Sequence, residues 1–371
     1  MQRIVRTRAE LLKALQSAHP GDWIQIDAPS IDGGLYLQGV SGTAKQPIRL
    51  SSRDPAHPAM IRGSRCGIQL SQCAHWHIIG LRFEGQTVHC LNLDDGGVRT
   101  QPVVGVMLSR LELRHAGTHG NTEAIKLSGL NEFTIEACRV HRWGSEGQGI
   151  DLVGCHKGQI RECLLQARDD WGVGIQTKGG SSQIVITRCR FERAGRRAVN
   201  IGGGTGLEFF RPPLTSGAPH AEARAISVEF CEFIGSEAPI AFVGVDGALV
   251  QHNTFYMPTR WILRILQENT NAGFVPSRKG IFRRNIIVFH SARWASGGVN
   301  IGPQTAPETF QFKENWWYCA DAPRQSQPRL PTPEVGGVYG RDPRLQNPDA
   351  GDLRCAPDSP ARDYGACYNS G

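Results

Sequence analysis

The chain has 371 residues and a formal net charge of +7, and it is 40% hydrophobic, enough to bury a sizeable core and to exclude an intrinsically disordered protein. Its 44 glycines and 22 prolines are spread along the whole length and favour a fold with many turns. No run approaches the roughly 18 apolar residues that a membrane span needs.

The N-terminal segment, residues 1–22, is expected to cap the fold. Residues 7–18 have the apolar spacing of an amphipathic helix. The segment has no apolar stretch of the kind found in a signal peptide. A secreted or periplasmic protein whose leader is absent from this chain and a cytoplasmic protein therefore both fit.

A repeat occupies most of the remaining chain. In each copy an aliphatic residue is followed by two other residues and then by a position that is Leu, Cys or Asn, called here the special position. One other residue and a large apolar residue come after it. The regular copies recur about every 25 residues, a period typical of solenoids. The special positions are Leu81, Leu111, Cys138, Cys163, Cys189, Cys231, Asn253, Asn285 and Asn315.

Between these copies lie short segments that alternate with period two, as strands with one buried face do. Stacked rungs about 4.8 Å apart share a continuous core that a single rung cannot form. We predict an all-β single domain over residues 1–371: a right-handed parallel β-helix with rungs over 23–318 and an irregular C-terminal wrap over 319–371. The alternating segments include 91–93, 125–127, 150–152, 175–177 and 199–201.

The special positions are predicted to form a ladder inside one turn of the coil. Buried cysteine behaves as a small hydrophobic residue, and stacked asparagines can hydrogen-bond to each other and to the backbone. We therefore interpret the four ladder cysteines as core residues and not as disulfide or metal ligands. Cys355 and Cys367 in the tail are candidates for a disulfide, and the sequence leaves that pairing open.

The middle residue of each alternating segment is expected to face outward, so that these residues form a column. Lys126, Asp151 and Lys178 fall on three consecutive rungs, roughly 5 Å apart per step. This spacing lets several side chains meet one sugar unit, whereas an ordinary solvated wall is the alternative. The column comprises Asn92, Lys126, Asp151, Gln176, Asn200, Ala241, Arg264 and Asn300, with Lys178 two residues beyond Gln176.

The loops that enter these strands add candidates for a glycan site. Trp143 and Trp171 are flanked by charged residues and suit stacking on a pyranose ring. The alternative is that both tryptophans pack neighbouring loops together. The charged candidates in these loops are Asp169, Asp170, Arg196 and Arg197.

Two long loops interrupt the regular rung length. They span residues 203–223 and 267–279, and the second contains Glu268. Long insertions in a solenoid usually lie over its functional face, although a tolerated surface loop is the alternative. We expect both loops to cover the outward column.

Several stretches resemble the pectate-lyase-like β-helix superfamily, most closely the polysaccharide lyases that include chondroitinase B and alginate lyases. These stretches are residues 18–26, 42–50, 78–83, 342–345 and 358–365. Such lyases cleave uronic-acid polymers by β-elimination. The resemblance implies that Lys178 is the base, that Arg197 or Arg196 is the neighbouring cation, and that calcium is held by carboxylates close by.

Two alternatives to the lyase remain. Asp169–Asp170 is similar to the paired aspartates of polygalacturonases and, with Asp151 nearby, implies glycoside hydrolysis, which needs one carboxylic acid and one carboxylate. The late arginine of that family would correspond to Arg264. In a non-catalytic glycan-binding or structural β-helix, the column would instead be an ordinary solvent-exposed surface.

The expected partner is an acidic polysaccharide or oligosaccharide. Nucleic acid is not expected, because the positive charge is dispersed and no known reading motif is present. We also expect no membrane partner, no metal ligands recognisable in the sequence, and a monomer or weak oligomer.

Overall fold

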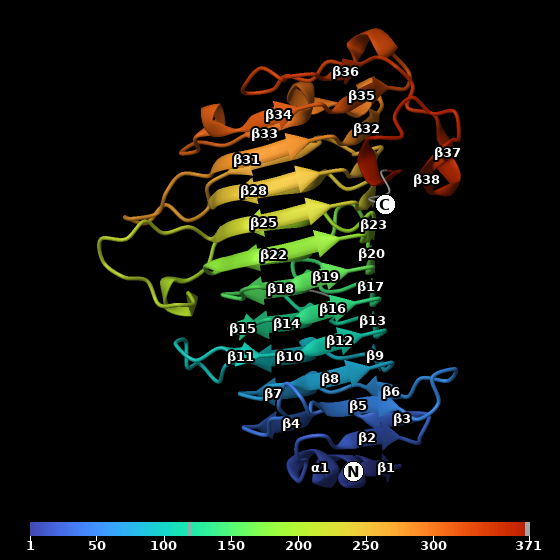
Figure 1. Cartoon of the computed structure of the whole chain (residues 1–371), viewed down its shortest axis with the longest axis vertical. Coiled ribbons are helices and arrows are strands. Elements are labelled where there is room, and N and C mark those ends of the chain that lie inside the picture. The colour runs from blue at the N-terminus through green and yellow to red at the C-terminus, as the bar shows by residue number, and fades with distance from the viewer. Residues whose placement is uncertain (118–119, 368–371) are drawn as a thin grey trace.

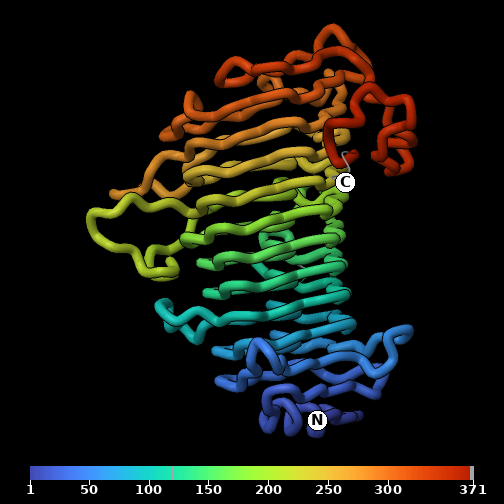
Figure 2. Tube along the Cα trace, in the orientation of Figure 1, coloured from blue at the N-terminus to red at the C-terminus, as the bar shows by residue number. Residues whose placement is uncertain are grey.

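A computed structural model describes residues 1–117 and 120–367, and the strands of these residues form a right-handed parallel β-helix (Figures 1 and 2). The coil runs from an N-terminal helix at one end to the C-terminal segment at the other. Each regular rung gives one strand to each of three long parallel sheets, named here sheets A, B and C. The predicted fold class is confirmed.

The strand bounds show how short each element is. Sheet A contains β1 (Gln2–Val5), β2 (Trp23–Ile26), β5 (Ile48–Ser52), β8 (Trp76–Ile79), β12 (Met107–Ser109), β16 (Thr134–Glu136), β19 (Gln159–Arg161), β22 (Ser181–Thr187), β25 (Ala223–Glu229), β28 (Val245–Gln251), β31 (Arg278–Arg283) and β34 (Gln311–Lys313). Sheet B contains β3 (Ser30–Asp32), β6 (Met60–Arg62), β9 (Arg82–Glu84), β13 (Glu112–Arg114), β17 (Arg139–His141), β20 (Leu164–Gln166), β23 (Arg190–Glu192), β26 (Glu232–Ile234), β29 (Thr254–Tyr256), β32 (Ile286–Phe289), β35 (Trp316–Cys319) and β36 (Val338–Tyr339). Sheet C contains β4 (Leu35–Gln38), β7 (Cys66–Ser71), β10 (His89–Asp94), β14 (Glu123–Ser128), β18 (Gln148–Val153), β21 (Val173–Lys178), β24 (Arg197–Gly202), β27 (Ala238–Val243), β30 (Leu263–Leu266) and β33 (Val299–Ile301).

The core fills the inside of the coil. On sheet C the inward residues Ile125, Ile150, Ile175 and Val199 stand in register on consecutive strands, and each is fully buried. Because side chains alternate along a strand, the residue between each inward pair must point to the opposite face. The core pattern therefore fixes which residues form the outer face.

The ladder occupies the turn between sheets A and B, as predicted. Its four cysteines are buried and unpaired. Asn253 Nδ2 donates to Asn285 Oδ1 at 3.1 Å, and Asn285 Nδ2 donates to Asn315 Oδ1 at 3.0 Å. The residue before each asparagine is left-handed, for example Glu314 with φ of 53°. Such a conformation costs roughly 1–2 kcal/mol in an L-residue, and the ladder hydrogen bonds offset part of it.

The N-terminal cap contains more than the predicted helix. Helix α1 (Arg8–Gln16) begins with a capping box between Thr7 and Glu10 and buries Leu11 and Leu15 against the coil. Before it, β1 pairs in parallel with β2 as an additional first strand of sheet A. The first strand of the solenoid therefore precedes the helix instead of following it.

The C-terminal segment is largely irregular and folds back along sheet B, beside the upper rungs in Figure 1. Leu353 and Ala361 pack against outward apolar residues such as Ile286. The disulfide that the sequence left open is present between Cys355 and Cys367. The remaining strands are β11 (Val103–Val104), β15 (Leu130–Asn131), β37 (Leu345–Asn347) and β38 (Asp352–Cys355). No helix among the described residues is long and apolar enough to cross a membrane.

Candidate functional site

The predicted outward column stands in register on sheet C. Lys126 pairs with Asp151, Asp151 with Gln176, and Gln176 with Asn200 on successive strands. Lys178 ends strand β21, two residues beyond Gln176. The polar residues that the sequence placed on consecutive rungs are therefore spatial neighbours.

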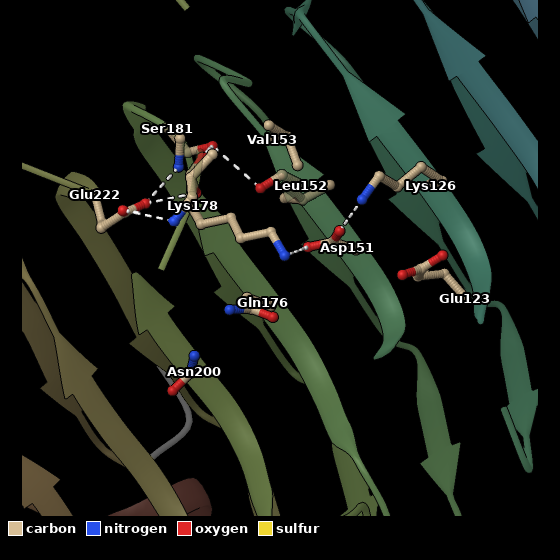
Figure 3. A network of polar contacts seen from close by, with 12 residues as sticks. Glu123, Lys126, Asp151, Leu152, Val153, Gln176, Lys178, Ser181, Asn200 and Glu222 are labelled. Atoms are coloured by element: carbon tan, nitrogen blue, oxygen red, sulfur yellow. Dashed lines mark hydrogen bonds and ion pairs between the residues drawn. The ribbon is translucent and has the colours of Figure 1, made fainter. Parts of the chain in front are cut away.

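Three side chains of this face form one ionic cluster (Figure 3). The Asp151 side chain is fully buried and lies between the ammonium groups of Lys126 and Lys178. Lys126 Nζ donates to Asp151 Oδ2, and Lys178 Nζ lies 3.4 Å from Asp151 Oδ1. One buried carboxylate is therefore shared by the side chains of two lysines on the neighbouring strands.

Two carboxylates act on the ammonium group of Lys126. Burial lowers the pKa of Lys126, but the carboxylates of Asp151 and Glu123 outweigh it and raise that pKa above its ordinary value of 10.5. Lys126 is therefore a fixed cation at neutral pH. Glu123 is itself 3% exposed, and its Oε2 atom lies 2.9 Å from His89 Nδ1.

A cavity of about 490 Å³ opens over this cluster. Its volume falls in the range of ordinary small-ligand sites, which is roughly 300–1,000 Å³. Strands β10, β14, β18 and β21 form its floor, and two loops form its sides. The lining residues are His89, Asn92, Asp94, Gly97, Lys126, Ser128, Val153, Lys178, Gly204, Thr205, Gly206, Phe209 and Arg211.

One side of the cavity is the first long loop, residues 203–222, named here the wall loop. It is tied to residues 95–102, a shorter loop after β10. Arg211 of the wall loop forms a two-pronged ion pair with Asp95, with Nε–Oδ2 at 2.6 Å and Nη2–Oδ1 at 2.8 Å. Arg99 Nη1 also donates to the Glu208 carbonyl oxygen at 2.6 Å. These contacts hold the two loops together beside the lysines.

The buried carboxylate of Glu222 anchors the base of the wall loop. It accepts a hydrogen bond at 2.9 Å from the backbone N–H of Gly179, the residue that follows Lys178. It also accepts from the backbone N–H of Thr205 at 2.9 Å and from the Thr205 hydroxyl at 2.7 Å. Asn269 of the second long loop donates to it at 3.0 Å. Glu222 therefore connects both long loops to the turn that carries Lys178, a role that the sequence did not reveal.

Three predicted sugar-binding residues do not face the cavity. Gln176 and Asn200 are 6% and 1% exposed, and both side-chain amides donate to the Gly202 carbonyl oxygen. Trp143 is fully buried in the core. In this structure none of the three side chains is open to a ligand. The two amides are covered although they point outward on their strands, and Trp143 packs inward from its loop.

A second polar cluster lies on later rungs. Arg197 Nη1 lies 2.8 Å from Glu268 Oε1, and Arg264 Nε donates to Asn300 Oδ1 at 2.9 Å. Burial and the charge of Arg197 lower the pKa of Arg264. Arg197 starts strand β24, whereas the residue of β24 level with Lys178 is Gly202, about 17 Å further along the strand. Arg197 therefore lies away from Lys178. The cation that shares the Asp151 carboxylate with Lys178 is Lys126.

The paired aspartates lie at the opposite end of β21 from Lys178. Asp169 Oδ2 lies 2.9 Å from Arg193 Nε, and Asp170 Oδ2 lies 2.8 Å from Arg168 Nη2. The structure therefore does not bring this pair together with Asp151.

Two further candidates share that end of the strand. Trp171 donates from Nε1 to the Trp143 carbonyl oxygen and packs against the core. Arg196 is exposed, and its Nε atom donates to the Trp171 carbonyl oxygen at 3.4 Å. Packing between loops accounts for both residues.

Calcium needs several oxygen ligands that converge on one point. Among residues 1–117 and 120–367, no group of three or more His, Cys, Asp or Glu side chains could hold a metal ion. Asp151 and Glu123 are the carboxylates nearest Lys126, and the Lys126 ammonium already interacts with both. The described residues therefore do not fit the calcium that the resemblance implies.

Some cavity residues were missed although the sequence held a signal for them. Asp94 and Ser128 stand in register with each other at the carboxyl ends of their strands, as Lys178 does on β21. The two-residue offset that identified Lys178 would have identified both. Arg211 and Phe209 gave no such signal, because only the path of the wall loop brings them to the cavity.

Comparison with known proteins agrees with this architecture. A model of the family described as the right handed beta helix region matches residues 66–255. No curated protein sequence matches significantly. A lacto-N-biosidase from Eubacterium ramulus is 13% identical over 88% of this chain and 63% of its own, with a TM-score of 0.53.

Two lyases give similar values. The pectate lyase Pel9A is 13% identical over 82% of this chain and 73% of its own, with a TM-score of 0.50. An alginate lyase from Paenibacillus sp. is 14% identical over 82% of this chain and 96% of its own, with a TM-score of 0.48. At these identities the likeness to the lacto-N-biosidase and to Pel9A shows a shared fold alone.

Proposed function

This chain belongs to the right-handed β-helix family, and from that premise we propose that it is an enzyme that cleaves a uronic-acid-containing polysaccharide by β-elimination. The observation that carries the proposal is the Lys126–Asp151–Lys178 cluster in a ligand-sized cavity. The Lys126 ammonium lines this cavity and suits a sugar that bears a carboxylate. The pectate lyase Pel9A and the lacto-N-biosidase support the fold, and the substrate class rests on the site.

The two lysines are given different roles in this proposal. Lys126 remains protonated because Asp151 and Glu123 raise its pKa, so it binds the carboxylate of a uronate and stabilises the charge that develops there. Lys178, held less closely by Asp151, is the base. A free amine accepts a proton, whereas an ammonium cannot.

The proposed step balances without a cofactor. Lys178 takes the proton from the carbon beside the uronate carboxylate, and the electron pair left behind forms a carbon–carbon double bond. The glycosidic carbon–oxygen bond then breaks, and its oxygen leaves with a proton taken from solvent or from the newly formed Lys178 ammonium. No step passes through calcium, because the described donor sets do not fit that ion.

The test is a screen of alginate, pectate, hyaluronan and chondroitin or dermatan sulfate. Elimination creates an unsaturated product whose ultraviolet absorbance rises with time. A hydrolase would release reducing ends without that absorbance, and a binding protein would give neither signal. Reducing ends without absorbance, or no turnover of any acidic polymer, would overturn the proposal. Addition of EDTA to an active reaction should leave the rate unchanged.

A further inference from the structure

The wall loop presents an aromatic ring to the cavity. Phe209 is 54% exposed, and it lines the same cavity as Lys126 and Lys178. Its neighbour Phe210 is 1% exposed and packs edge-to-face against Phe274, with ring centroids 5.4 Å apart. One ring of the pair is therefore used to hold the wall loop in place, whereas the other is left open beside a charged floor.

The backbone around Phe209 is held from several directions. The residue ends a 3-10 turn, Leu207–Phe209, whose last N–H donates to the Gly206 carbonyl oxygen at 2.9 Å. Arg211 Nη1 donates to the Phe209 carbonyl oxygen at 2.8 Å. Since Arg211 is itself fixed by its ion pair with Asp95, the ring is carried by a preorganised segment.

The floor below the ring is polar. Asp94 Oδ1 accepts from Ser71 Oγ at 2.6 Å, which fixes that carboxylate, and Asn92 and Ser128 line the cavity with it. A pyranose has an apolar face of C–H groups and a rim of hydroxyls. An aromatic ring on one side of a cavity and hydrogen-bonding groups on the other match those two surfaces.

We propose that Phe209 is the stacking platform of a sugar-binding subsite next to the Lys126–Asp151–Lys178 cluster. The ligand is a pyranose unit of the polysaccharide. It belongs to the same sugar chain as the uronate whose carboxylate lies at Lys126. This inference rests on the proposed function, because it takes the ligand to be a glycan. It replaces the buried Trp143 and the packed Trp171 as the aromatic contact of the site.

The test measures binding and kinetics together. Phe209→Ala should weaken binding of short alginate, pectate, hyaluronan or chondroitin oligosaccharides about tenfold, equivalent to about 1.4 kcal/mol. KM should rise while kcat changes little, because the ring contacts substrate and transition state alike. Phe209→Tyr and Phe209→Trp should stay within about threefold of wild type, since each keeps a stacking face. Isothermal titration gives the affinities, with Lys178→Ala as the background so that no ligand is consumed.

Two controls separate stacking from other effects. Leu207→Ala removes an exposed apolar side chain from the same turn but outside the cavity lining, and binding should not change. Phe209→Leu keeps the apolar volume without the ring and should bind as weakly as Phe209→Ala. Wild-type affinity in either Phe209→Ala or Phe209→Leu would overturn the inference. If wild type cleaves a polymer and these variants bind normally, only this inference fails; if wild type binds none of the four, the proposed function fails with it.

Discussion

The two ends of strand β21 carry opposite arrangements of charge. At its carboxyl end, Lys178 and Lys126 share the single buried carboxylate of Asp151 beside a cavity. In the turn before its amino end, Asp169 and Asp170 each have an arginine of their own and lie away from that cavity. One strand therefore joins a buried cluster of lysines and a carboxylate beside a cavity to two carboxylates that are paired with arginines outside it.

The contrast shows why residue type alone does not identify a site. The sequence offered Lys178 with Arg197 or Arg196 for a lyase and, on a shorter motif, the paired aspartates for a hydrolase. An exposed ion pair is worth little, about 0–1 kcal/mol, and leaves no charge over for a ligand. The cluster of Lys126, Asp151 and Lys178 is largely buried, and both of its lysines line the cavity, where they can contact a ligand. The comparison favours chemistry at the carboxyl end.

The largest expected effect is at Lys178. Lys178→Ala should lower turnover of a confirmed substrate about a thousandfold, within the range of removing a general base. Lys178→Arg keeps the charge but not the base, so it should be nearly as inactive. Initial rates from ultraviolet absorbance give both values. An active Lys178→Arg enzyme would make the side chain an electrostatic contact and not the base.

The next effect is on stability at Asp151. Asp151→Asn leaves two partly buried ammonium groups around a neutral amide and should lower the free energy of unfolding by about 3 kcal/mol. Asp32→Asn breaks an exposed pair with Arg62 and should change it by less than about 1 kcal/mol. Urea unfolding of both variants measures the difference. Equal losses would show that the cluster has no special energetic role.

A smaller effect is expected on pH dependence. Since the folded-state pKa of Lys126 lies above 10.5, the ammonium contributes stability and ligand binding below that pH and loses both as pH rises through the raised pKa. Binding of an acidic oligosaccharide through Lys126 should therefore persist up to pH 10.5 and weaken above it. In Asp151→Asn the weakening should begin at lower pH. Measurement of Kd against pH for both proteins tests this expectation. An identical profile in the two proteins would contradict it.

The smallest effect is expected at the other end of β21. The double variant Asp169→Asn, Asp170→Asn should keep wild-type turnover, and its free energy of unfolding should change by no more than about 1 kcal/mol. The same absorbance and urea assays apply. A tenfold fall in turnover would return the paired aspartates to the site and favour the hydrolase.

Most of the fold was predictable from the repeat, because a strand with one buried face must alternate and a solenoid must repeat that alternation. The ladder of Cys138 through Asn315 and the outward direction of Lys126, Asp151 and Lys178 follow from the same rule. The extra strand β1 was not predictable, since a four-residue strand before a helix carries no copy of the repeat.

The site was predictable only in part, because segments distant in the sequence decide which side chains are covered. Alternation gives the direction of a side chain, but it does not say what covers that side chain. Gln176 and Asn200 point outward by the same rule as Lys126, and yet both are buried and hydrogen-bonded to Gly202. Trp143 has the sequence context of a surface aromatic residue and lies in the core.

The sequence by itself determined the β-helix, its inner ladder and the column in which the lysines stand, because these depend on contacts that recur at a fixed interval along the chain. Only the tertiary structure showed that Arg197 lies away from Lys178 and that Arg211 and Phe209 reach the cavity. Arg211 meets Asp95 across more than a hundred residues, through a loop without a repeat. No local pattern encodes such a contact, since it exists only when the stacked rungs bring the two loops to the same edge.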